Sequence, residues 1–186
     1  YSYFTNKIIP DYETDRSKII YENLNGYSIT KGISFMVNQS FNNPFKVSLG
    51  GTLLDAFEIE SEERLPILFA PNFSGVFTVS YHFEKIKTNI DYSGNVIGKM
   101  HLPTYNSPFE RPETSPWYSV QNVQLTKEIN ERLSFYISVK NLLNYTQSIS
   151  PIVDFENPYS DDFDTSYAYC PLQQRRFLVG IRLKIK

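Results

Sequence analysis

The sequence contains a single cysteine and no long apolar run, and each absence excludes a class of protein. Cys170 is the only cysteine among 186 residues, so the chain can form neither a disulfide framework nor a multi-cysteine metal site within itself. Without a run of about 18 apolar residues, it has no candidate membrane-spanning helix. The mean hydropathy of -0.35 is typical of a soluble protein, but the strands of a membrane barrel alternate in polarity and average to similar values.

The chain also lacks an excess of positive charge. Its formal net charge of -2 provides no basic stripe that could neutralise phosphates, so nucleic acid is not an expected partner. No Ser, His and Asp arrangement, paired-carboxylate spacing or phosphate-binding loop is recognisable. We therefore expect neither an enzyme nor a bound cofactor.

What the sequence has is a composition that favours β-structure, with 14 Tyr, 14 Phe and few Ala. Apolar and polar residues alternate with a period of two, which predicts an all-β fold of about eight antiparallel strands. Several of these strands are long enough to cross a bilayer at a tilt. The predicted strands cover residues 2–9, 26–41, 45–59, 72–83, 87–102, 117–127, 133–145 and 174–186.

The predicted connections alternate between short and long. Short turns fall at 42–44, 84–87 and 128–132, and long connections at 10–25, 60–71, 103–116 and 146–173. Short turns on one rim and long loops on the other are typical of an up-and-down transmembrane β-barrel.

The first long hairpin predicts which face meets lipid. Folding it about residues 42–44 places Phe41 opposite Phe45 and makes Lys31 face Asp55, the two charges on otherwise apolar faces. They lie ten residues from the turn, a height of about 25 Å at a barrel tilt of roughly 40°. We expect this charge pair to mark the outer lipid interface.

The opposite faces of the strands are polar, as expected of a wet lumen. The turn at 84–87 sets Phe83 opposite Thr88 and Val79 opposite Tyr92 on the apolar side. On the other side we expect three lumen-facing side chains, which are His82, Asp91 and Lys140. The last strand should turn five apolar residues to lipid, which are Phe177, Val179, Ile181, Leu183 and Ile185.

Three segments carry a resemblance to a known family. They are the Asn141-Leu142-Leu143-Asn144 motif before a proline-containing loop, the segment 117–127 (WYSVQNVQLTK), and the alternating last strand. Together they resemble the C-terminal part of a TonB-dependent outer-membrane receptor, particularly the Bacteroidetes kind. Nearly the whole chain is covered, because the resemblance begins at residues 3–8.

The resemblance implies a barrel of about 22 strands, of which residues 1–186 would form one C-terminal section. Such receptors lie in the outer membrane of Gram-negative bacteria and import a scarce nutrient, such as haem, cobalamin or a ferric siderophore. The implied partners are the lipid bilayer, the other barrel strands, and a plug domain and TonB-binding segment that are not found in this sequence.

Two alternatives stay open at this point. The chain could instead be a complete eight-stranded barrel, either an outer-membrane structural protein or a lipocalin-like carrier. The acidic residues Asp161, Asp162 and Asp164 could supply oxygen ligands for Ca²⁺ in a long outer loop. His101, near the same rim, could contact haem or a metal, although it lies too far from His82 to share one ion.

Overall fold

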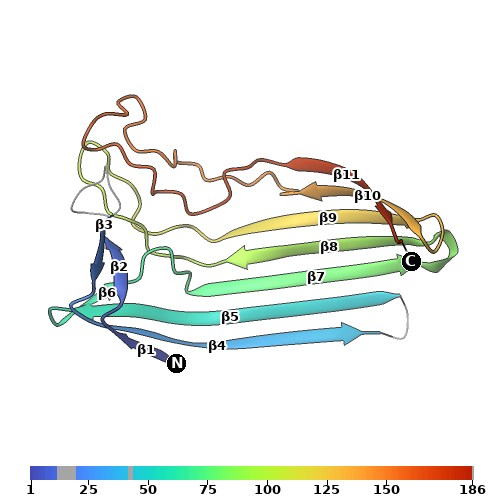
Figure 1. The fold of residues 1–186 in the computed structure, drawn as a ribbon, viewed down its shortest axis with the longest axis horizontal. Helices are drawn as coiled ribbons and strands as arrows, with labels where there is room; N and C mark the ends of the chain where they lie inside the picture. Colours follow the sequence, from blue (N-terminus) through green and yellow to red (C-terminus); the bar gives the residue numbers. More distant parts are fainter. Residues whose placement is uncertain (12–19, 42–43, 186) are drawn as a thin grey trace.

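The computed structural model describes residues 1–11, 20–41 and 44–185, and its main element is one long antiparallel sheet (Figure 1). The order of its path is β1-β4-β5-β7-β8-β9-β10-β11, so from β4 onward each strand pairs with the next one on the path. The strands are β1 (Ser2–Thr5), β4 (Gly26–Ser40), β5 (Phe45–Glu60), β7 (Phe73–Phe83), β8 (Thr88–Ile97), β9 (Tyr118–Glu128), β10 (Leu133–Lys140) and β11 (Arg176–Leu183).

Apart from the turn predicted at 42–44 and the connection predicted at 10–25, which include residues outside the described ranges, the connections follow the predicted alternation. Short ones join β7 to β8 and β9 to β10 at one end of the sheet, and the long loops gather at the other end (Figure 1). The β7–β8 turn is the 3-10 helix η1 (Glu84–Ile86), which ends on Lys87 in the left-handed region at φ 47°. No helix in the described ranges is long and apolar enough to cross a membrane.

The register predicted for both long hairpins is confirmed. Lys31 pairs with Asp55 across β4 and β5, and Phe83, Tyr81, Val79 and Phe77 of β7 take their expected partners on β8. The backbone N–H of Phe41 donates to the Phe45 carbonyl at 3.2 Å. Short turns fix the register because they leave the two strands little freedom to slip.

Four predicted strands were too long, and local backbone geometry explains two of the errors. The predicted strand 2–9 is interrupted at Asn6, whose φ of 54° turns the chain away from the sheet. The predicted strand 133–145 ends at Lys140 because Asn141 takes φ 51°. The strands predicted at 87–102 and 174–186 also end early, at Ile97 and Leu183.

The prediction missed three short strands in the long connections. β2 (Ile8–Asp11) and β3 (Ile20–Asn23) form a separate two-stranded sheet, and β6 (Glu63–Pro66) folds back on β5. Part of the predicted connection 10–25, residues 12–19, lies outside the described residues. Strands of four residues contain too few alternations to be recognised by period alone.

Aromatic rings lie across glycines of neighbouring strands on the sheet. Phe35 pairs with Gly51, and a Cβ at Gly51 would lie 2.7 Å from the Phe35 ring. Phe77 covers its partner Gly94 in the same way. Because glycine has no side chain, the ring can lie flat on the backbone, which protects the weak point that glycine makes in a strand.

The buried core lies among the long loops rather than within the sheet. It contains residues from 100–105, 153 and 167–169, and Val153 and Tyr167 are fully buried. By contrast, many large apolar side chains of the sheet are exposed, including Ile33 and Phe35 on β4 and Val179 on β11. The loop end is therefore packed like a small globular protein, and the sheet is not.

Candidate functional site

A buried polar contact joins two loops that are far apart in the sequence. The Tyr105 hydroxyl donates to the Asp164 carboxylate at 2.6 Å, and the Ser166 hydroxyl and backbone N–H donate to the same carboxylate at 2.8 and 2.7 Å. Charge-assisted bonds of this kind hold a buried carboxylate that would otherwise be costly. The contact therefore fixes the loop 98–117 against the loop 141–175.

Arg111 makes a second link between the same two loops. Its guanidinium donates to the carbonyls of Ser150 and, at 2.9 Å, Ile152. The same group lies 4.9 Å from the centre of the Tyr167 ring. A planar guanidinium can form both kinds of contact at once, so this single side chain holds carbonyls and an aromatic ring together.

The Asn-Leu-Leu-Asn motif closes the longest loop at its base. The Asn141 side chain is buried; its amide donates to the carbonyls of Tyr145 and Gln173 at 2.8 and 3.1 Å, and its oxygen accepts from Tyr145 N–H at 2.8 Å. Asn144 accepts from the backbone N–H of Arg175 at 2.7 Å. Both asparagines have positive φ, which Asn tolerates better than most residues. The motif thus ties the start of the loop to its end.

Burial makes the tyrosines of this cluster weak acids. Desolvation raises the pKa of Tyr169 to about 12, and it raises the pKa of Tyr105 further, assisted by the neighbouring Asp164 carboxylate. Desolvation also raises the pKa of Cys170, so this thiol is not activated as a nucleophile. The loop cluster provides a rigid scaffold of neutral rings rather than acid or base chemistry.

A second group, which we call the rim cluster, lies on the apolar face of the sheet, toward the end that carries the long loops. It consists of Lys31, Asp55, Phe57 and Arg64. Lys31 and Arg64 each pair with one oxygen of Asp55, at 3.2 and 2.8 Å. The Arg64 guanidinium also lies 3.9 Å from the centre of the Phe57 ring. Arg64 comes from β6, the short strand that the sequence did not reveal.

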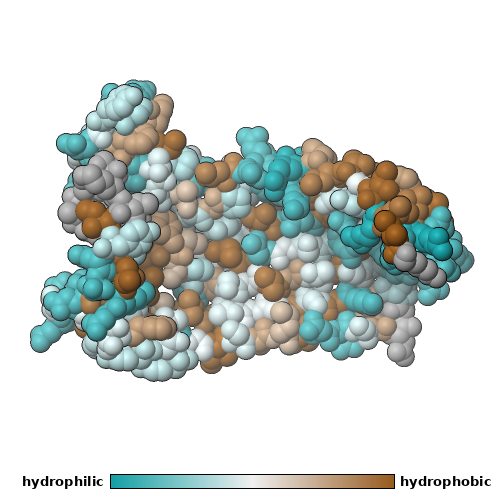
Figure 2. All heavy atoms as spheres, viewed as in Figure 1, coloured by the Kyte–Doolittle hydropathy of each residue, from teal (hydrophilic) through white to brown (hydrophobic). Residues whose placement is uncertain are grey.

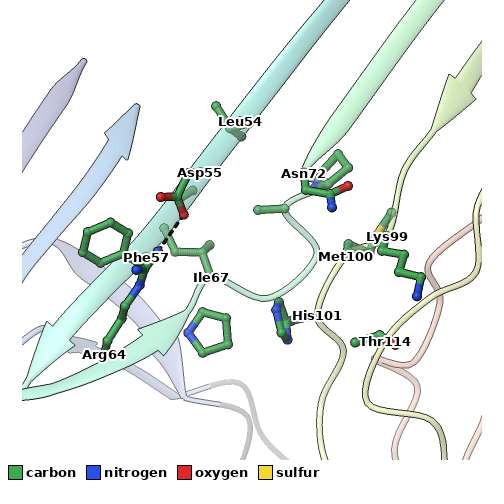
Figure 3. Close-up of a pocket in the computed structure, with 14 residues that line it drawn as sticks. Leu54, Asp55, Phe57, Arg64, Ile67, Asn72, Lys99, Met100, His101 and Thr114 are labelled. Atoms are coloured by element: carbon green, nitrogen blue, oxygen red, sulfur yellow. Dashed lines mark hydrogen bonds and ion pairs between the residues drawn. The ribbon is translucent and has the colours of Figure 1, made fainter. Parts of the chain in front are cut away.

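A hollow of about 460 Å³ adjoins the rim cluster (Figure 3). Asp55, Phe57 and Arg64 line one side of it, and Lys99 and His101 line the other. Between them the lining is largely apolar. It includes Pro66, Ile67, Ala70, Pro71 and Met100. The hollow forms where β5 runs on past the start of β7, so the two strands are no longer neighbours.

The side chains predicted to face the lumen lie on the polar face of the sheet. The Asp91 carboxylate accepts from the Ser80 hydroxyl at 2.6 Å, and His82 contacts Asn89 at 2.5 Å. Lys140 is exposed, and it lies opposite Arg176 of β11 in the strand register. Pale and brown spheres cover much of the middle of the sheet in Figure 2, and teal spheres gather at both of its ends.

The last strand places its predicted apolar residues on one exposed face. Phe177, Val179, Ile181 and Leu183 are opposite Val139, Ile137, Phe135 and Leu133 of β10. Their exposed fractions are 72, 77, 65 and 61%, and that of Ile185, just beyond β11, is 89%. An apolar face so open to its surroundings requires cover that the described residues do not supply.

The predicted Ca²⁺ ligands do not come together. Asp164 is buried and uses its carboxylate to bind Tyr105 and Ser166, while Asp161 is exposed. In the part of the chain that the structure describes, no three His, Cys, Asp or Glu side chains form a group that could hold a metal. His101 lines the rim hollow rather than joining such a group.

Comparison with solved structures identifies the fold, although no family model and no curated protein matches the sequence. The pyoverdine outer-membrane receptor FpvA of Pseudomonas aeruginosa matches 98% of this chain and 26% of its own at a TM-score of 0.65 and 16% identity. The ferric-catecholate import receptor Fiu of E. coli K12 matches 97% of this chain and 24% of its own at 0.63 and 18%.

A mutant of the ferric enterobactin receptor of Pseudomonas aeruginosa matches 97% of this chain and 28% of its own at a TM-score of 0.64 and 13% identity. These proteins are TonB-dependent outer-membrane receptors. The chain has the fold of one section of a TonB-dependent receptor barrel. It spans about a quarter of the length of each of these receptors.

The sheet of this receptor-like section is open. β1 and β11 are the two ends of the strand order, and the described strands do not close into a ring. This corrects the alternative of a complete, closed eight-stranded barrel, because closure requires the first and last strands to pair. The exposed apolar face also differs from that of a soluble carrier, which places its apolar residues inside.

Proposed function

We propose that residues 1–186 form a section of the barrel wall of a TonB-dependent receptor in the outer membrane of a Gram-negative bacterium. The main support for this proposal is that the strands have a long exposed apolar face on one side of the sheet and a polar face on the other. Lipid covers such a face at no cost, and water in a lumen solvates the other. The fold shared with known receptors supports the same arrangement.

In this orientation the long loops lie outside the cell and the short turns face the periplasm. Lys31 and Asp55 then mark the outer lipid interface, and Phe177 to Ile185 face lipid. His82, Asp91 and Lys140 face the lumen, where a plug domain of the complete protein is the expected partner. The section itself catalyses nothing, and its role is to provide a rigid wall and folded outer loops.

We infer that the nutrient is an iron chelate of the siderophore class, rather than haem or cobalamin. The support is the names of the similar receptors, which are for ferric catecholates, pyoverdine and ferric enterobactin. Energy would come from TonB acting on the plug, so the wall does not need to move. The packed loop cluster of Tyr105, Asp164 and Tyr167 would hold the outer loops in shape for capture.

Uptake of radiolabelled iron chelates by a deletion strain tests this proposal. Loss of uptake of one ferric siderophore, restored by the intact gene, is the expected result, with labelled haem and cobalamin as matched controls. Unchanged uptake of every ferric siderophore would overturn the nutrient class. Recovery of the protein as a folded monomer without detergent would overturn the barrel-wall role itself.

A further inference from the structure

The rim cluster has more positive charge than its own carboxylate can neutralise. Lys31 and Arg64 occupy the two oxygens of Asp55, which leaves one positive charge in excess. The side chains are open to the surroundings, with exposed fractions of 54% for Lys31 and 57% for Arg64. The remaining N–H groups of both cations are therefore accessible to a further anion.

The geometry concentrates this charge at one place. Both cations lie over the Phe57 ring, with Lys31 Nζ 5.7 Å and the Arg64 guanidinium 3.9 Å from its centre. The ring and the shared carboxylate hold the two long side chains side by side, so little further ordering is needed when an anion binds. A phosphate group accepts hydrogen bonds from such a pair readily.

The surroundings of the cluster are amphipathic. On one side is the exposed apolar face. Its nearest residues are Ile33 and Leu53, which lie two residues from Lys31 and Asp55 on the same face of their strands. On the other side is the hollow of about 460 Å³ with Lys99 and His101 on its far wall (Figure 3). In the described residues Lys99 has no ion-pair partner, so it adds a second unneutralised charge.

We propose that the rim cluster binds the phosphate headgroup of an anionic membrane lipid, whose acyl chains lie along the apolar face past Leu53 and Ile33. This inference rests on the proposed barrel-wall function, because that function places the cluster at the lipid interface. Cations at that depth attract anionic headgroups, and an apolar wall below them accommodates the chains. A soluble phosphate would use the cations but gain nothing from the wall.

Native mass spectrometry of the protein purified from outer membranes in detergent tests the proposal. The probes are phosphatidic acid, phosphatidylcholine with the same acyl chains, and the soluble glucose 6-phosphate. Phosphatidic acid should be retained preferentially. Each of Lys31→Gln and Arg64→Gln should weaken its retention by about fivefold, because each cation contributes roughly that factor near an anionic surface. Lys85→Gln, which removes a charge at the η1 turn, should change nothing.

Three results would overturn the lipid site. They are equal retention of the two lipids, retention unchanged in the Lys31→Gln, Arg64→Gln double variant, and equal binding of glucose 6-phosphate. If the protein still requires detergent while any of these occurs, the barrel wall stands and only the lipid site fails. A Phe57→Leu variant keeps both cations and should weaken retention less than either charge variant.

Discussion

The loop end and the sheet of this molecule are stabilised in different ways. The loops pack around a buried core that includes Tyr105, Val153 and Tyr167, with the Asp164 carboxylate inside it and the half-buried Arg111 guanidinium at its edge. The sheet has few buried side chains, and its apolar residues point outward. The loop end therefore depends on its own packing, whereas the sheet depends on hydrogen bonds between strands and on the medium that covers it.

The largest effect on stability is expected at Tyr167, the largest fully buried side chain of the loop end. Tyr167→Ala should destabilise the loop cluster by about 3–5 kcal/mol, because it removes a fully buried ring and leaves a cavity. Limited proteolysis should then cut the loops 98–117 and 141–175 while the strands remain protected. Tyr159→Ala, at a fully exposed ring of the same loop, is the control. Protection of the loops in the Tyr167 variant would contradict this division.

The next effect tests the medium that covers the sheet. Val179→Arg should destabilise the folded protein in lipid by about 2–4 kcal/mol, because a charge would face the middle of the bilayer. Leu178→Arg places the same charge on the opposite face of the same strand and should cost much less. Urea unfolding in lipid vesicles measures both. Equal losses would mean that the two faces meet the same solvent.

A smaller effect is expected where the two regions join. Asn141→Ala removes three hydrogen bonds to backbone groups and leaves a residue at φ 51° that Ala adopts less readily. The loop base should lose about 2 kcal/mol, since each such bond contributes about 1 kcal/mol and some groups find water instead. Hydrogen exchange at Tyr145 N–H reports the loss. Asn157→Ala, on the exposed part of the loop, should leave that exchange unchanged.

The smallest effect is a response of the loops to alkaline pH. Burial raises the pKa of Tyr169 to about 12, above the value near 10 of an unfolded tyrosine. A raised pKa in the folded state contributes stability below pH 10, and that contribution is lost as pH rises from 10 to 12. Phenolate absorbance should therefore show a late-ionising fraction that becomes smaller by one tyrosine in Tyr169→Phe, because Tyr105 and Tyr118 still ionise late. Strand hydrogen exchange should not follow this titration.

The sequence predicted the sheet better than the loops for a physical reason. Alternation along Gly26–Ser40 and Phe45–Glu60, joined by a short turn, determines both faces and the register, so Lys31 and Asp55 could be paired in advance. The Tyr105–Asp164 contact joins residues 59 apart and follows no period. Arg64 was missed for the related reason that its strand has only four residues. Asn141 was noted as part of a motif, but its role in closing the loop required the three-dimensional structure.

Phe35 over Gly51, and Phe77 over Gly94, impose a constraint on how this wall can change over generations. A side chain at either glycine would collide with the ring opposite, with a Cβ 2.7 Å from the ring in both cases. Loss of a ring alone would leave bare backbone on an exposed face. Each ring and its glycine must therefore be replaced together. A variant with only one of the two replaced should be less stable than either the original pair or the fully replaced pair. We expect such pairs to be inherited as units while the side chains around them drift.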